Sequence, residues 1–535
     1  MLRIHIALAF FATILLFAVA NRQQKKDTQS IDFKFPETAE TVVLDPVSGI
    51  KIPVTRFSFE DLKKRARSMA HGRYVKPQFV STQYLKGLSW DQYKNIRFKP
   101  ESSLWKKEGN SFQIQFFHPG HLYNTNVTLH EIRSDYSRQI PYDQSYFDLS
   151  NLKVQGETPE NLGYSGFKIH YPLNTEEHTD EFMVFQGASY YRMVSKKQVY
   201  GLSARGIAIN TGMPYPEDFP GFTHFWIVHP DKTDSTVFVY ALLDGKTATG
   251  AYEFQISPGK VSSVHVTAEV TLRTKVDRFG IAPLTSMYWY SETRGIPEGK
   301  IYPESHDSDG LMIESSKGDW IWRPLDNPKR VTMNSFQDES PRAFGLIQRD
   351  RNFASYQDNS MKYHLRPSAW VEPEGNWGKG SIQLLQLPTV KDSDDNIGAF
   401  WVPAAFPAPL QPYEFSYTIR WLNEDPLPDE LAKTVSTRIA SVPGESDMRV
   451  FYVDFVGENL KALDAYTYLQ AAIDTGDNAE LTDYNIQKIE ETGVWRLTFR
   501  VVQKNKNKPA ELRAVLKRNQ EDLSEIWTFT LESTI

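Results

Sequence analysis

Short alternations of apolar and polar residues recur along most of this chain. Phe112, Ile114 and Phe116 alternate with glutamines, a pattern typical of a strand with one face in water. Residues 236–243 form a short apolar run rich in β-branched and aromatic side chains, and residues 261–272 alternate again. Clusters of Gly, Pro, Asn and Asp separate these runs, as expected of loops. The pattern therefore predicts an all-β fold built of β-sandwiches.

One helix is predicted early in the chain, over residues 58–70. Ser58 can cap its first turn, and Asp61 stands at the position that answers such a cap. The apolar side chains that fall near one face of this helix are Phe59, Leu62, Ala66 and Met69.

A break in the periodicity indicates a boundary near residue 425. Residues 423–430 contain two prolines and four acids. Four strand-like runs follow it, at 449–455, 495–502, 511–517 and 526–531. We therefore expect a large domain over residues 21–424, a linker over 425–434 and an immunoglobulin-like β-sandwich over 435–535, although no Cys-Trp-Cys pattern supports that type.

The first twenty residues have the pattern of a secretory signal peptide. Arg3 supplies the charged end, residues 4–17 are predominantly apolar, and residues 18–20 read Ala-Val-Ala, the small-x-small site expected before cleavage. The apolar run is short for a membrane span, so an uncleaved anchor is the weaker alternative. No twin-arginine pair precedes the run, which favours export in the unfolded state.

Composition narrows the choice of function. Apolar residues make up 40% of the chain and charged residues 24%, as in ordinary globular proteins. The net charge of −6, without a long basic run, gives no reason to expect nucleic-acid binding. The absence of cysteine excludes disulfides, thiolate nucleophiles and Cys-ligated zinc. The standard phosphate-loop, zinc-helix and nucleophile-elbow motifs are also absent, so no cofactor is predicted.

Two acidic clusters are the candidates for chemistry. Residues 306–311 read His-Asp-Ser-Asp-Gly-Leu, and residues 392–397 read Asp-Ser-Asp-Asp-Asn-Ile. Both are also ordinary turn sequences, because Asp and Ser bond their own backbone and Gly accepts positive φ. The first cluster lacks a calcium loop's ligands, since Ser305 stands at the first position and the bidentate Glu is missing, so no bound metal is predicted.

The alternative to turns is a pair of catalytic carboxyl groups. Glycoside cleavage needs one acid to protonate the leaving oxygen and one carboxylate to activate water or attack carbon. Aromatic residues, 13% of the chain, are frequent around the clusters and suit both sugar stacking and core packing. The pattern alone does not choose among the acids.

Several sequence blocks resemble one known family, the osmoregulated periplasmic glucan biosynthesis proteins. Their order and number make the match specific, although the last hundred residues resemble the family more weakly. The blocks are residues 185–192, 200–206, 222–226, 279–287, 318–325, 363–370 and 375–380.

This resemblance implies a fold, a location and a substrate. The fold is a large galactose-mutarotase-like β-sandwich followed by a smaller immunoglobulin-like one, and the location is the periplasm. The substrate is β-1,2-glucan, handled together with an inner-membrane glucan synthase. One branch of the family resembles an inverting endo-β-1,2-glucanase, and the other acts in elongation, trimming or transfer. The missing twin-arginine signal points to the second branch.

The resemblance also implies roles for particular residues. Asp395 would be the general acid, and Asp307 the general base, reached through a relay of water and sugar hydroxyl. Tyr363 and Arg366 match residues that line the family's cleft. Further substrate contacts are predicted at His306, Asp309, Trp370, Trp377 and Trp401, with core packing as the alternative for the tryptophans.

Three functions remain open at this level. The first is a hydrolase or transglycosylase of β-1,2-glucan, and the presence of both Asp307 and Asp395 favours it. The second is a non-catalytic protein that binds nascent glucan and escorts it from the synthase. The third, a mutarotase-like isomerase, rests on fold analogy alone.

The signal-peptide pattern makes a direct prediction. The mature protein should begin near Asn21, because cleavage is expected after Ala20. Intact-mass measurement of the protein from the periplasmic fraction tests this, and a chain that still carries Met1 would contradict it.

Overall fold

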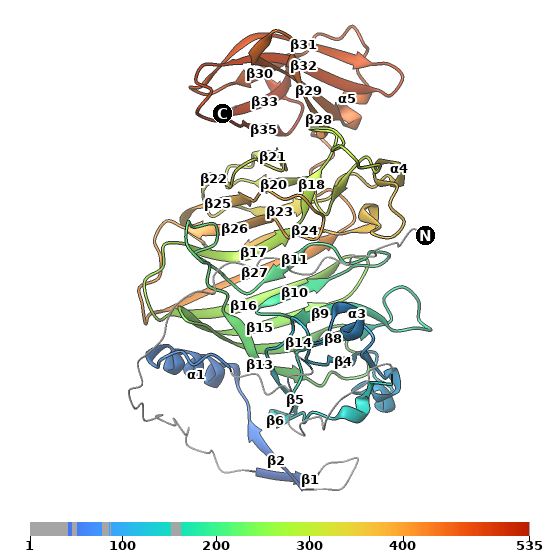
Figure 1. Ribbon diagram of the computed structural model, residues 1–535, viewed down its shortest axis with the longest axis vertical. Helices are drawn as coiled ribbons and strands as arrows, with labels where there is room; N and C mark the ends of the chain where they lie inside the picture. Colours follow the sequence, from blue (N-terminus) through green and yellow to red (C-terminus); the bar gives the residue numbers. More distant parts are fainter. Residues whose placement is uncertain (1–40, 45–50, 78–84, 86, 151–161, 534–535) are drawn as a thin grey trace.

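The computed structural model describes residues 41–44, 51–77, 85, 87–150 and 162–533. The predicted signal peptide, residues 1–20, lies outside the described residues. Strands dominate the described part, which confirms the all-β prediction. Two large sheets form the body of the molecule, and a smaller group of strands lies at the end where the chain finishes (Figure 1).

The first large sheet runs the length of the body. Neighbouring strands are antiparallel, except that β5 and β13 are parallel. Its order is β1 (Thr41–Leu44), β2 (Lys51–Arg56), β6 (Tyr136–Gln139), β5 (Thr128–Arg133), β13 (Gly221–Val228), β14 (Val237–Asp244), β15 (Ala248–Ser257), β16 (Ser262–Leu272), β27 (Pro412–Leu422), β24 (Ser368–Glu374), β23 (Ala343–Ile347), β20 (Gly310–Glu314) and β21 (Trp320–Pro324).

The second large sheet is antiparallel throughout. Its order is β4 (Gln113–Phe117), β8 (Gly166–Tyr171), β9 (Asp180–Gln186), β10 (Tyr190–Met193), β11 (Ser203–Arg205), β17 (Phe279–Ser286), β26 (Ile397–Pro403), β25 (Lys379–Gln386) and β22 (Thr332–Glu339), with β12 (Ala208–Ile209) also paired to β17.

Aromatic side chains fill the space between the two sheets. The ring of Phe185 in β9 meets that of Phe254 in β15 edge-on, with centroids 5.2 Å apart. Tyr191 in β10 and Tyr417 in β27 bring their hydroxyl oxygens to 3.5 Å. Such contacts bury large apolar areas and prefer edge-to-face geometry. The aromatic richness of the sequence therefore serves first to build this core.

The predicted early helix is present as α1 (Phe59–His71). The Ser58 side chain caps it by accepting a hydrogen bond from the backbone N–H of Asp61, at 3.1 Å. Leu62 and Ala66 are buried against the outer face of the first sheet. None of the described helices is long and apolar enough to cross a membrane.

The remaining elements of the body are short. They are α3 (Trp90–Tyr93), α4 (Phe353–Tyr356), β3 (Arg97–Phe98), β7 (Phe147–Asp148), β18 (Tyr288–Tyr290), β19 (Ser305–His306) and the 3₁₀ turns η1 (Pro100–Ser102), η2 (Lys106–Glu108), η3 (Gln144–Tyr146) and η4 (Tyr363–Leu365).

The C-terminal strands make a second, smaller sandwich. All four strand-like runs expected after residue 440 are confirmed as strands. One sheet has the order β28 (Lys433–Val442), β29 (Glu445–Val456), β32 (Val494–Gln503) and β31 (Ala479–Ile489); the other contains β35 (Ile526–Leu531), β33 (Ala510–Arg518), β30 (Gln470–Asp474) and β34 (Glu521–Asp522). A short helix, α5 (Glu458–Lys461), lies between β29 and β30.

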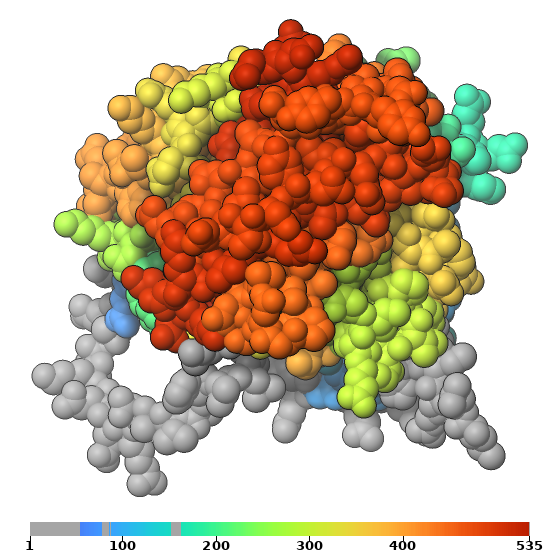
Figure 2. Space-filling view, turned by 90° about the horizontal axis from the view of Figure 1, so that it is seen from above, coloured from blue at the N-terminus to red at the C-terminus, as the bar shows by residue number. Residues whose placement is uncertain are grey.

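The two sandwiches are joined edge to edge. Strand β35 pairs in parallel with β21, so the first large sheet continues into the C-terminal strands. Trp322 and Trp370 of the body are buried in the same apolar cluster as Trp527 of β35. Seen from above, the C-terminal residues cover most of this end of the body (Figure 2). The predicted linker, residues 425–434, follows β27 and includes the first two residues of β28, and the division into separate domains stays a prediction.

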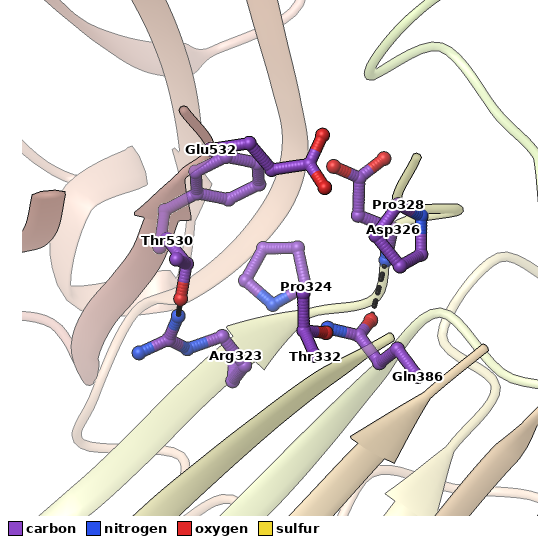
Figure 3. A pocket seen from close by; sticks show the side chains of 9 residues that line it. Arg323, Pro324, Asp326, Pro328, Thr332, Gln386, Thr530 and Glu532 are labelled. Carbon is purple, nitrogen blue, oxygen red and sulfur yellow. Dashed lines mark hydrogen bonds between the residues drawn. The ribbon is translucent and has the colours of Figure 1, made fainter. Parts of the chain in front are cut away.

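Polar contacts complete the junction. Figure 3 shows a small cavity lined from both sides, where Arg323 of β21 donates a hydrogen bond to Thr530 of β35 at 2.6 Å. Nearby, the buried guanidinium of Arg349 pairs with Asp425 at 2.6 Å and with Glu525 at 2.6 Å and 2.7 Å. The same guanidinium lies 3.6 Å from the ring centroid of Trp322. One arginine of the body thus forms ion pairs with Asp425, in the predicted linker, and with Glu525, directly before β35.

Replacing this arginine should weaken the whole fold. Arg349→Met leaves Glu525 and Asp425 buried without their cation, which should cost about 3–5 kcal/mol in the free energy of unfolding. Denaturant unfolding measures this. The matched control is Arg420→Met, which removes a solvent-exposed pair with Glu372 worth about 0–1 kcal/mol. Equal losses in the two variants would contradict the assigned role of Arg349.

Candidate functional site

The predicted catalytic residues lie on loops and strands from both large sheets. Asp307 lies between β19 and β20, and Asp395 lies in the loop between β25 and β26. Arg366 follows directly after η4, and Arg192 lies in β10. The site is therefore assembled from segments that are far apart in the sequence.

Asp307 is buried and paired with a fixed cation. The guanidinium of Arg366 donates a hydrogen bond to its Oδ1. Arg366 itself is held by the backbone oxygen of Met361, which accepts from its Nε at 3.3 Å and its Nη2 at 3.2 Å. A side chain at Gly201 would meet the Cβ of Arg366 at 2.9 Å, so this close packing requires glycine. Met361 and Gly201 thus fix the position of the guanidinium that pairs with the buried Asp307 carboxylate.

Asp395 has a different environment. Its side chain is 21% exposed, and its Oδ2 lies 3.6 Å from Nη2 of Arg192. Burial raises the pKa of the Asp395 carboxyl to about 6, against the opposing effect of the Arg192 cation. The negative charge of Asp307 raises this pKa further, and the cation of Arg366 lowers it. The structure therefore brings Asp395, Asp307 and Arg366 into one electrostatic environment.

The ring of Tyr363 packs against the guanidinium of Arg366. Its ring lies 4.4 Å from the guanidinium carbon of Arg366. Its hydroxyl donates to Asp392 at 3.4 Å and accepts from Ser305 at 3.1 Å. The ring is almost fully buried, so Tyr363 lies beside the predicted site, and its visible contacts position Arg366.

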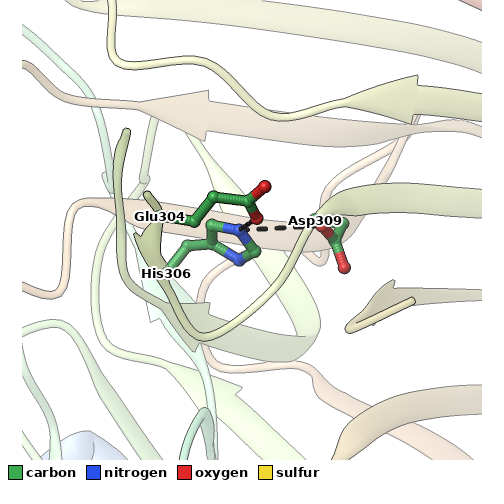
Figure 4. A group of neighbouring side chains, drawn as sticks. All are labelled: Glu304, His306 and Asp309. Carbon is green, nitrogen blue, oxygen red and sulfur yellow. Dashed lines mark hydrogen bonds and ion pairs between the residues drawn. The ribbon is translucent and has the colours of Figure 1, made fainter. Parts of the chain in front are cut away.

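His306 and Asp309 form a separate cluster with Glu304 (Figure 4). Nε2 of the fully buried His306 lies 2.9 Å from Oε2 of Glu304 and 3.7 Å from Oδ1 of Asp309. Burial alone would lower the pKa of His306, but the two carboxylates outweigh it and raise that pKa to about 9. Burial raises the pKa of Glu304 to about 7. A buried His306 ring cannot reach a substrate, so the predicted sugar contact at His306 is corrected to a contact inside the protein.

The three predicted tryptophan contacts also need correction. Trp370 stacks on Trp320, with centroids 5.8 Å apart, inside the cluster shared with the C-terminal sandwich. Trp377 and Trp401 pack against each other and belong to the core between the large sheets. All three indoles are buried, so protein covers the ring faces that a sugar would need. The three tryptophans are therefore core residues and not sugar contacts.

Two contributors to these clusters were not singled out from the sequence. Arg192 stands at the end of one of the blocks that carry the family resemblance, but nothing in a single arginine shows which carboxylate it will face. Glu304 stands two positions before His306, and residues two apart on an extended chain project to the same side. The spacing of Glu304 and His306 could therefore have predicted that their side chains lie close together.

Comparisons with known proteins find the same family along nearly the whole chain. The model of a family described as "Periplasmic glucan biosynthesis protein, MdoG" matches residues 57–531. A protein named glucans biosynthesis protein G from Serratia proteamaculans (strain 568) is 40% identical over 489 residues, which cover 90% of this chain and 94% of the relative. One of the same name from Ralstonia nicotianae (strain ATCC BAA-1114 / GMI1000) is 41% identical over 483 residues, which cover 89% and 96%. The similarity includes the C-terminal strands.

The ion pair between Arg192 and Asp395 predicts a measurable change in the pKa of Asp395 when the arginine is replaced. Because the Arg192 cation lowers the pKa of Asp395, Arg192→Gln should raise that pKa above its value of about 6. Carbon-13 NMR of the Asp395 carboxyl across the pH range measures the change. Arg420→Gln removes a surface cation elsewhere and serves as the control. An unchanged titration in Arg192→Gln would show that this ion pair does not act on Asp395.

Proposed function

Because this chain belongs to the MdoG family of periplasmic glucan biosynthesis proteins, we propose that it takes part in glucan biosynthesis by cutting or transferring the glucan backbone. In this proposal it acts on β-1,2-glucan as an inverting endo-glucanase or transglycosylase. The family resemblance read from the sequence blocks is thereby confirmed, and the reaction is the part that is proposed.

The observation that carries the proposal is the contrast between two neighbouring carboxyl groups. Asp395 has a pKa raised to about 6, so it can keep a proton in mildly acidic and near-neutral solution. Asp307 forms an ion pair with the Arg366 guanidinium, which donates a hydrogen bond to its Oδ1. Acid–base cleavage of a glycoside needs this division into one proton donor and one base.

The proposed reaction moves two protons. Asp395 gives its proton to the glycosidic oxygen as the bond to the anomeric carbon breaks. Water, or the hydroxyl of another glucan chain, attacks that carbon from the opposite face. The proton lost by this nucleophile passes through a sugar hydroxyl to the Asp307 side. Water gives hydrolysis and a sugar hydroxyl gives transfer, and both routes invert the anomeric centre.

A second function is favoured by a surface feature. Tyr466 is 94% exposed and Tyr468 77% exposed, both in the segment between α5 and β30 of the C-terminal sandwich. Exposed aromatic side chains are suited to contacts with sugars or partner proteins. In this alternative the chain binds nascent glucan and escorts it from an inner-membrane synthase without cleaving it.

The general acid gives the sharpest test of catalysis. Asp395→Asn should keep the fold and glucan binding but reduce cleavage or transfer by about 10²–10⁴-fold, the usual contribution of one general acid. In the unaltered protein the rate should fall as pH rises through about 6, because Asp395 then loses the proton that it must donate. Product chains from purified linear β-1,2-glucan, separated by size across the pH range, provide the measurement.

The control is Asp483→Asn, the same chemical change in an exposed residue of the C-terminal sandwich. It should leave the rate unchanged. An Asp395→Asn protein of full activity would remove Asp395 from the mechanism. Tight glucan binding by an unaltered protein that never shortens or transfers the chain would favour the escort function.

A further inference from the structure

The cluster of Glu304, His306 and Asp309 is built around one imidazole nitrogen. The three side chains supply one nitrogen and two carboxylate oxygens that all lie within 4.8 Å of one another. Figure 4 shows both carboxyl groups on the Nε2 side of the ring. The cluster does not include Asp395 or Arg366, and the proposed glycoside chemistry does not use it.

Gln348 fixes which nitrogen of His306 carries a proton. The Gln348 amide nitrogen donates to the backbone oxygens of His306 at 3.1 Å and of Tyr363 at 3.3 Å. Its Oε1 must therefore face Nδ1 of His306, 3.1 Å away. Because Oε1 can only accept, Nδ1 carries the hydrogen. Nε2 is then the nitrogen that faces the two carboxylates, with either a second proton or a metal ion between them.

Asp309 is held in place just as firmly. Its Oδ2 accepts hydrogen bonds from the backbone N–H groups of Arg349 and of Asp350, the latter at 2.9 Å. Its Oδ1 remains directed at Nε2 of His306, 3.7 Å away. Outer hydrogen bonds that orient a histidine and a carboxylate in this way are typical of metal sites.

Two carboxylates facing one imidazole nitrogen require a positive charge between them, supplied either by a second proton on the ring or by a bound metal ion. A proton on Nε2 meets this need only in part, since one N–H points at one oxygen, and the Asp309 distance of 3.7 Å exceeds a hydrogen bond. An ion bound at about 2.0–2.1 Å from each ligand in tetrahedral geometry holds its ligand atoms about 3.3 Å apart. The distances from Nε2 of His306 to the Glu304 and Asp309 oxygens, 2.9 Å and 3.7 Å, lie on either side of that value.

We propose that Glu304, His306 and Asp309 bind a divalent transition-metal ion of the Zn²⁺ type, with Nε2 of His306 and one oxygen of each carboxylate as ligands. One imidazole and two carboxylates suit Zn²⁺ better than Ca²⁺ or Mg²⁺, which take oxygen ligands alone. Water completes the coordination. The ion ties Glu304 and His306, before Asp307, to Asp309, after it, so its role is structural.

This site is independent of whether the protein cleaves glucan, and its test does not use activity. The full mature chain is stripped of metal with a chelator, dialysed and titrated with ZnCl₂ by isothermal calorimetry. One equivalent should bind per chain, and the bound zinc should raise the melting temperature, because it binds the folded state. Elemental analysis after dialysis checks the stoichiometry.

Glu304→Gln is the main variant, because it removes a ligand charge while keeping the shape of the side chain. It should bind zinc at least about tenfold more weakly, and zinc should no longer raise its melting temperature as it does in the unaltered protein. His306→Gln should abolish binding. His178→Gln removes an exposed histidine and should bind zinc like the unaltered protein.

Two results would overturn the proposal. One is an unaltered protein that takes up no stoichiometric zinc, which would leave His306 with a proton only. The other is a folded Glu304→Gln protein that binds zinc as tightly as the unaltered one, which would place the metal elsewhere. Circular dichroism of the variants establishes that each is folded, and Glu304→Gln keeps the test decisive if His306→Gln does not fold.

Discussion

The ion pair between Arg366 and Asp307 is the contact around which the candidate site is organised. It joins a loop at the edge of β20 to the segment after η4, 59 positions later in the chain. Both groups are buried, and burying a carboxylate is costly unless a cation accompanies it. Met361, Tyr363 and the absent side chain of Gly201 keep the guanidinium where the carboxylate needs it. Fixing Arg366 also fixes one of the charges that act on Asp395, beside those of Arg192 and Asp307.

Two chemically identical groups acquire different properties from this arrangement. Asp307 receives the direct hydrogen bond of an arginine and its side chain is 6% exposed, whereas the Asp395 side chain is 21% exposed and has a cation 3.6 Å away. In the proposed reaction, this difference in surroundings, and not the residue type, makes Asp395 the proton donor. This division is what the proposed glycoside chemistry would use.

Arg349 links the site to the C-terminal sandwich. Its backbone N–H donates a hydrogen bond to Asp309, in the cluster with Glu304 and His306. Its guanidinium forms ion pairs with Asp425 and Glu525. The C-terminal strands therefore share sheet, core and charge pairing with the body. A single residue thus contacts both the C-terminal strands and Asp309, two positions after Asp307.

The sequence determined the features that depend on local pattern. Alternation and turn residues predicted the strands around residues 112–116, 236–243 and 261–272, and Ser58 with Asp61 predicted the capped start of α1. The family blocks identified the family and pointed to Asp307, Asp395, Tyr363 and Arg366, which the structure brings together.

Tertiary structure alone decided the rest, because burial and charge pairing depend on residues far apart in the chain. An alternating pattern does not state which aromatic rings a second sheet will cover, so it leaves sugar contact and core packing both open for Trp370, Trp377 and Trp401, and the structure buries all three. The pairing of Asp395 with Arg192, 203 positions away (395 − 192), leaves no trace in local periodicity. The orientation of the His306 ring likewise depends on Gln348, which directly follows β23 and lies beside His306 only in the folded chain.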